Sequence, residues 1–267
     1  MLRRKIIKKN NDKGRYIIST LCIGQKYIPI LKHWRENLKK KCKDFEIKII
    51  TEKETSGIHI WYDRLLFNYN LLLEYNKDII MCDLDCIIRN DIKPLLEIEG
   101  DIIVSKEIGG KKAYPQEYSS NLGFGVCCGF MILKKNSEKI INNILENNDK
   151  SNFDDQVNLM KYLVNCKNKE IYEKDFFIEE KKYKNIIIEL KDEKIKIVVL
   201  DFELVIRDPI NSGLQFADHI NIDNVRGAQN FINYFYKDLE VLPLTCRCGR
   251  KDLGDFNICT HVRKSIK

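Results

Sequence analysis

Two carboxylates separated by one residue, Asp83 and Asp85, directly follow a short apolar run, 79–82. The run predicts a buried strand, and on an extended backbone residues i and i+2 project to the same side. The two carboxylates are therefore expected to converge on one point at the end of the strand. Paired oxygen donors suit Mg2+ or Mn2+, and such an ion can hold phosphate oxygens. Because ligand sites of open α/β sheets lie at that edge of the sheet, the pattern predicts a site for a metal ion and a diphosphate.

Alternating strands and helices are expected to position this acidic pair. Residues 16–23 predict a first strand, apolar residues recur at helical spacing over 27–38, and 45–50 predict a second strand. A second helix over 58–73 leads into the strand before Asp83. This order predicts an α/β fold with a mostly parallel mixed sheet flanked by helices on both faces. Further strands are expected at 101–105, 126–133, 186–190 and 195–201, further helices at 137–147 and 155–164, and a mobile loop at 109–125.

The composition is that of an ordinary globular protein. The chain has 267 residues, 44% of them hydrophobic and 32% charged, which suits one large domain with its own core. The net charge of +7 favours anionic partners such as nucleotides, but it is spread along the chain, so no nucleic-acid partner is expected.

No stretch approaches the roughly 18 apolar residues of a transmembrane helix, and the basic N-terminus lacks the apolar core of a signal peptide. We therefore expect a soluble, cytoplasmic protein. Its ten cysteines are then expected to be thiols or metal ligands rather than disulfides.

Three further motifs follow the acidic pair along the chain. A run of small and apolar residues, 123–133, contains Gly129, and an acidic pair precedes Gln156 where a helix is predicted to begin. His219 lies on a late predicted strand. This order resembles that of the GT-A-type glycosyltransferases, especially the retaining glycogenin-like and xylosyltransferase-like families, over roughly residues 15–230. The His-x-x-Gly-x-x-Lys-Pro-Trp ending of glycogenin-like members is absent, so the subfamily and the role of Arg226 stay open.

The resemblance implies roles for individual residues in a nucleotide-sugar site. Metal binding is implied for Asp83, Asp85 and His219. Catalysis is implied for the helix start, chiefly Asp155, with Gln156 and Asp154. Binding of the donor nucleotide sugar is implied for Thr20, Cys22, Arg64, Asp83, Gly129 and Arg226.

Most of these residues also have a structural interpretation. The acidic pair at 83 and 85 is also compatible with a solvated turn, and His219 with a structural role. Arg64 is alternatively an exposed helix charge paired with Asp63 or Asn68. Either member of the second acidic pair, Asp154 or Asp155, could cap the helix while the other faces the acceptor.

The C-terminal part, 241–267, is basic and rich in cysteine, and we separate it from a main domain at 1–240. Two close pairs of soft ligands lie ten residues apart in it. Thiolates and imidazole suit tetrahedral Zn2+, although one residue within each pair is fewer than usual. The alternative is a basic tail with reduced thiols. The possible zinc ligands are Cys246, Cys248, Cys259 and His261.

These observations predict a metal-dependent hexosyl- or pentosyltransferase. It would move a sugar from a nucleotide-diphosphate sugar, with UDP favoured, to a hydroxyl of a glycan, lipid-linked or protein acceptor. The Asp155-Gln156 pattern favours retention of the anomeric configuration. A sugar-phosphate nucleotidyltransferase is an alternative, but residues 24–27 lack the glycine-rich basic signature expected after its first strand. A zinc-stabilised, non-catalytic binding module is the other alternative, and the oligomeric state stays open.

Overall fold

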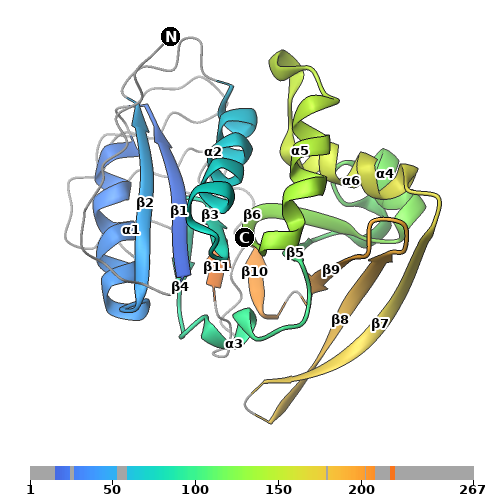
Figure 1. Ribbon diagram of the computed structural model, residues 1–267. Coiled ribbons are helices and arrows are strands. Elements are labelled where there is room, and N and C mark those ends of the chain that lie inside the picture. The colour runs from blue at the N-terminus through green and yellow to red at the C-terminus, as the bar shows by residue number, and fades with distance from the viewer. Residues whose placement is uncertain are drawn as a thin grey trace, which may run out of the picture.

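An eight-stranded mixed sheet forms the centre of the protein (Figure 1). The computed structural model describes residues 16–24, 27–52, 59–178, 180–201, 203–207 and 217–219. The strand order is β2-β1-β3-β6-β5-β9-β8-β7. The strands are β1 (Tyr16–Ile23), β2 (Phe45–Glu52), β3 (Ile79–Cys82), β5 (Ile102–Glu107), β6 (Gly125–Leu133), β7 (Lys169–Ile178), β8 (Lys181–Leu190) and β9 (Ile195–Leu200).

The sheet is mixed, as expected, but less parallel than expected. β1 pairs in parallel with β2 and β3, and β5 with β9. The other four pairings of this sheet, β3–β6, β5–β6, β7–β8 and β8–β9, are antiparallel. The cause is local for the last three strands, since the short connections between them permit only antiparallel neighbours. β7 and β8 form a long hairpin that extends from the body of the sheet (Figure 1).

Helices cover both faces of the sheet and create two apolar cores. Because side chains alternate along a strand, Ile18 of β1 joins the core under α1 (Ile28–Lys41), and Ile17 joins the opposite core. The second core lies under α2 (Ile60–Tyr75), α5 (Glu138–Glu146) and α6 (Asp155–Asn165). The expected α/β class is therefore confirmed.

Short elements complete the described structure. A three-stranded sheet has the order β10-β11-β4, and its strands are β10 (Val205–Arg207), β11 (Ala217–His219) and β4 (Cys86–Ile88). The short helices are α3 (Lys93–Leu96), α4 (Gln116–Leu122), η2 (Gly110–Lys112), η3 (Lys135–Ser137) and η4 (Lys150–Asn152).

The segment between β5 and β6, which we expected to be a mobile loop, has secondary structure of its own. It contains η2 and α4 and packs tightly on the start of β6. A Cβ added at Gly125 would lie 2.6 Å from the Cβ of Ala113. The hydroxyl of Ser119 donates to the carbonyl of Ala113 at 2.7 Å, so a side chain of α4 also holds the backbone of this segment.

No helix among the described residues is long and apolar enough to cross a membrane. The cysteines of the described residues are free, as expected. The proposed C-terminal part, 241–267, lies outside the described residues.

Candidate functional site

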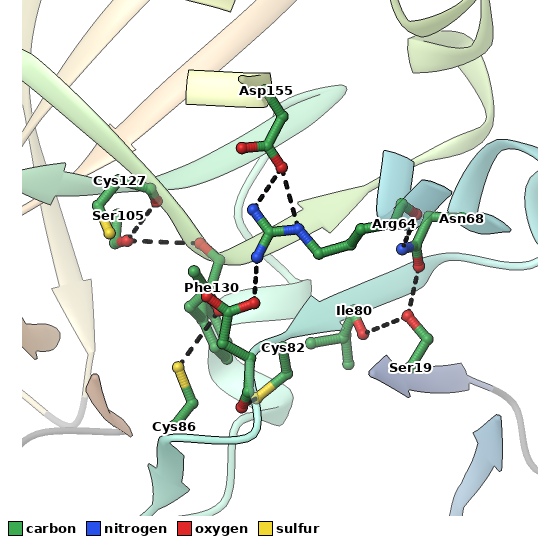
Figure 2. Close-up of polar contacts among 12 residues, drawn as sticks. Ser19, Arg64, Asn68, Ile80, Cys82, Cys86, Ser105, Cys127, Phe130 and Asp155 are labelled. Carbon is green, nitrogen blue, oxygen red and sulfur yellow. Dashed lines mark hydrogen bonds and ion pairs between the residues drawn. The ribbon is translucent and has the colours of Figure 1, made fainter. Parts of the chain in front are cut away.

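Arg64 joins two acidic side chains that lie far apart in the sequence (Figure 2). It projects from α2, and its Nη1 donates to Oδ1 of Asp83, directly after β3. Its Nε donates to Oδ2 of Asp155 at 3.0 Å, and Nη2 donates to the same oxygen. The guanidinium therefore holds the end of β3 against the start of α6, at one edge of the sheet.

Burial gives this cluster unusual electrostatics. The side chains of Arg64 and Asp155 are 8% and 3% exposed, whereas that of Asp83 is 28% exposed. Burial opposes the charge of Arg64, but Asp155 and Asp83 raise the pKa of Arg64 above its ordinary value, so it stays a cation. Burial raises the pKa of Asp155 to about 6, although Arg64 opposes this increase. One guanidinium thus faces two acidic side chains, which favours a further cation nearby.

Arg64 itself is held by a buried polar chain that links α2 to two strands. Asn68 Nδ2 donates to the carbonyl of Arg64 at 2.8 Å, and the hydroxyl of Ser19 donates to Asn68 Oδ1. Ser19 Oγ also lies 3.3 Å from the carbonyl oxygen of Ile80. Ser19 and Asn68 are fully buried. The alternative that Arg64 is an exposed helix charge is therefore wrong, and Asn68 contacts its backbone rather than its guanidinium.

The acidic pair at 83 and 85 lies on a turn rather than on an extended strand. β3 ends at Cys82, and the amide of Cys86 donates to the carbonyl of Asp83 at 3.0 Å. The prediction that i and i+2 project to one side of a strand is thus wrong here, because the backbone turns between them. The amide of Asp83 donates to the carbonyl of Gly129 at 2.8 Å, so Gly129 contacts this turn directly.

The residues near this turn fit a hard divalent cation in type, and metal binding stays a prediction. Within the described residues, no group of three potential metal-binding side chains is present. The backbone of His219 pairs with that of Cys86 in the β11–β4 ladder, so it runs beside the turn, but its side chain lies outside the description. The partly exposed carboxylate of Asp83 and the neighbouring Asp85 are the oxygen donors available there.

In the second acidic pair, Asp154 rather than Asp155 caps the helix, and contact of Asp155 with an acceptor stays a prediction. Asp154 is the N-cap of α6, and its Oδ1 accepts from the amide of Val157 at 2.9 Å. Its Oδ2 accepts from the hydroxyl of Tyr114 at 3.0 Å. Asp155 instead faces Arg64. Gln156 Nε2 donates to the carbonyl of Tyr114 at 2.8 Å, so Gln156 contacts the segment before β6 rather than the Arg64 cluster.

The remaining predicted donor residues are buried or lie outside the described residues. Thr20 is 1% exposed and Cys22 is 0% exposed, so their side chains are packed inside the sheet. Burial raises the pKa of Cys22 to about 11, which keeps it a thiol. Thr20 Oγ1 has no hydrogen-bond partner among the described residues. The residues outside the described part of the chain are Arg226, Cys246, Cys248, Cys259 and His261.

The sequence analysis gave no role to Ser19 or Ser105, and it named Asn68 only as a partner of an exposed Arg64. Ser19, Asn68 and Ser105 are polar residues at buried positions of apolar strands or helices. That position is a recognisable signal, because buried polar groups need partners. Most of their hydrogen-bond partners come from segments distant in the sequence. The sequence therefore does not show which groups these three side chains contact.

The fold was compared with those of solved structures. One is a glycosyltransferase involved in the glycosylation of the major capsid of PBCV-1, with 12% identity, a TM-score of 0.50, and coverage of 77% of this chain and 93% of that chain. Mouse xyloside xylosyltransferase 1 has 12% identity, a TM-score of 0.41, and coverage of 77% and 97%. A Bacillus anthracis protein assigned as a glucose-1-phosphate thymidylyltransferase has 13% identity, a TM-score of 0.36, and coverage of 55% and 82%.

These sequence identities are low, so the likeness concerns the fold alone. The assignment of the fold uses only the first of the three structures. A scan against protein-family models found no match, and a search of curated proteins found none either. The match to the first structure nevertheless covers 77% of this chain and 93% of that chain. The protein has the GT-A-type fold of glycosyltransferases.

Proposed function

We propose that this protein transfers a sugar from a nucleotide-diphosphate sugar to an acceptor hydroxyl, with Mn2+ or Mg2+ as cofactor. The observation that carries the proposal is the contact of Arg64 with both Asp83 and Asp155. It brings a partly exposed acid after a central strand next to a buried acid at a helix start. A glycosyltransferase-type fold supplies the setting.

The charged groups suit the two charges that develop during sugar transfer. Asp83 and Asp85, with His219, would hold the cation, which when bound supplies positive charge opposite the departing diphosphate. Arg64 adds a fixed positive charge beside Asp83, and fixed charges that need no rearrangement are effective in catalysis. The carboxylate of Asp155 lies beside this guanidinium, where it can stabilise positive charge that develops on the sugar.

Asp155 also has an oxygen free to contact a substrate. Arg64 uses only Oδ2, and among the described residues no hydrogen bond reaches Oδ1. We propose that Oδ1 accepts a hydrogen bond from a sugar hydroxyl. This use, together with the Asp155-Gln156 pattern, favours transfer with retention. A UDP-linked hexose or pentose is the donor that we propose.

The acceptor is proposed to approach from the side of Tyr114. Tyr114 is 57% exposed, and its hydroxyl donates to Asp154, the neighbour of Asp155 in the chain. Its chain neighbours Ala113 and Pro115 are buried, so an anchored backbone presents an exposed ring. Such a ring can pack against a glycan, a lipid-linked sugar or a protein acceptor.

The test is a panel of UDP-, GDP- and other nucleotide sugars with Mn2+, followed by nucleoside diphosphate release. Wild type is compared with Asp85→Ala and with Asp149→Asn, a matched acid that is exposed and accepts from Ser151. We expect nucleoside diphosphate release to be lost in Asp85→Ala and unchanged in Asp149→Asn. Equal release by wild type and Asp85→Ala would refute the site assignment. Pyrophosphate release from a nucleoside triphosphate and a sugar phosphate would instead favour a nucleotidyltransferase, and no turnover with bound zinc would favour a binding module.

A further inference from the structure

The pairing of β5 with β6 is interrupted beside the candidate site. Val104 pairs with Met131, but the next residue, Ser105, pairs with Cys127. The three residues between them on β6, 128–130, therefore have no partner on β5. Such bulges redirect the backbone and are common beside active sites.

The interrupted stretch holds the acidic turn. The carbonyl of Gly129 accepts from the amide of Asp83 at 2.8 Å and from Sγ of Cys86 at 3.2 Å. These donors lie at the two ends of the turn that carries Asp83 and Asp85. One carbonyl of the bulge therefore fixes where the turn begins and where it ends.

A buried hydroxyl spans the bulge itself (Figure 2). Ser105 is 2% exposed, and its Oγ lies 2.8 Å from the carbonyl oxygen of Cys127 and 3.4 Å from that of Phe130. These two carbonyls flank Gly129 on either side. Since buried carbonyls need donors, the hydroxyl stabilises the bulged path over a regular strand.

We propose that Ser105 is a positioning residue for the metal-binding turn. Ser105 acts through the bulge: it determines the position of the Gly129 carbonyl, which in turn holds the backbone amide of Asp83. It touches neither of the acidic side chains and no group of the Arg64 cluster in the contacts described above. The expected effect of Ser105 on metal-dependent activity rests on the proposed function, whereas its expected effect on the backbone of the turn does not.

The test uses two side chains of nearly equal shape at one position. Ser105→Thr keeps the hydroxyl, and Ser105→Val removes it; both residues are β-branched and suit a strand. Hydrogen exchange is measured at the amide of Asp83, and the Mn2+ concentration for half-maximal activity is measured in the donor assay. Ser137→Ala is the matched control, because Ser137 has an equally buried hydroxyl that donates to the carbonyl of Lys134 at 2.6 Å, away from the turn.

Loss of one net hydrogen bond predicts about fivefold to tenfold faster exchange at Asp83 in Ser105→Val. We expect a similar rise in the Mn2+ requirement, near wild-type behaviour in Ser105→Thr, and no change at Asp83 in Ser137→Ala. Equal behaviour of the Thr and Val variants would overturn the proposal, as would faster exchange at all core amides alike. If Ser105→Val does not fold, Ser105→Ala replaces it. If wild type turns over no donor, the proposed function fails, and exchange at Asp83 still decides the role of Ser105.

Discussion

Replacing Asp155 by asparagine is expected to stabilise the protein while removing its activity. The Asp155 side chain is 3% exposed, and burial raises its pKa from 3.8 to about 6 despite Arg64. Between these two values the folded protein holds a proton that the unfolded chain has released. The free energy of unfolding of the wild type therefore falls as pH rises through this window. The amide of asparagine has no charge to desolvate, so the variant avoids this fall.

The size of the effect follows from the pKa shift. Each pKa unit corresponds to about 1.4 kcal/mol, so a shift from 3.8 to about 6 makes the ionised carboxylate cost about 3 kcal/mol at pH 7 to 8. The opposing effect of Arg64 is already contained in that pKa. At pH 5, where the carboxyl is largely protonated in the folded protein, the same relation gives about half of this cost. The variant should thus gain stability over wild type as pH rises from 5 to 8.

The assay is urea unfolding of Asp155→Asn and wild type at several pH values between 5 and 8. Asp149→Asn is the control, because the amide of Ser151 lowers the pKa of Asp149. A lowered pKa contributes stability above the unfolded pKa and loses it only at lower pH, so this variant should be less stable than wild type by an amount that is constant from pH 5 to 8. Nucleoside diphosphate release by Asp155→Asn should fall about 100-fold or more, as when a fixed transition-state contact is lost. Destabilisation of Asp155→Asn at pH 8, or a difference that does not change with pH, would refute the reasoning.

Three further perturbations test the site and its support. Arg64→Lys should lower nucleoside diphosphate release at least tenfold, because one ammonium cannot reproduce a planar fork between two carboxylates; unchanged release would remove Arg64 from the mechanism. Gly125→Ala should lower the free energy of unfolding in urea by about 1–3 kcal/mol, because the new Cβ would lie 2.6 Å from that of Ala113. Unchanged stability would show that the segment before β6 moves to make room for the methyl group. Chelation by EDTA should stop release and added Mn2+ should restore it, and release that persists in EDTA would contradict metal dependence.

Local sequence patterns predicted most elements because the patterns report burial. β1 is a nearly continuous buried run, whereas α1, α2 and α6 repeat apolar residues at helical spacing, and all four were expected close to where they lie. β7 was missed, because six of its ten residues are exposed and its polar and apolar residues show no period of two. The direction of strand pairing was less predictable, because it depends on which strands become neighbours. The insertion of β6 between β3 and β5 is a long-range event with no local signal.

Residue types near the site were predictable, whereas their connections were not. Spacing indicated Asp83, and the family resemblance indicated Arg64 and Asp155, but nothing local indicates that one guanidinium contacts both acids. The turn after β3 also depends on distant atoms, since the carbonyl of Gly129 must be present to accept from it. A buried hydroxyl such as that of Ser105 becomes informative only when its partners are known.

Asp155 differs from the usual partner in a structural ion pair, because burial raises its pKa although Arg64 lies beside it. An ion pair that serves stability lowers the pKa of its carboxylate, because the partner favours the charged form more than burial opposes it. At Asp155 the balance is reversed, although Arg64 donates to it twice. The second carboxylate on the same guanidinium, Asp83, contributes to this reversal. Acids with strongly perturbed pKa values are found more often at functional sites than elsewhere. The raised pKa of buried Asp155 therefore agrees with the proposal of a chemical role for the acids that Arg64 contacts.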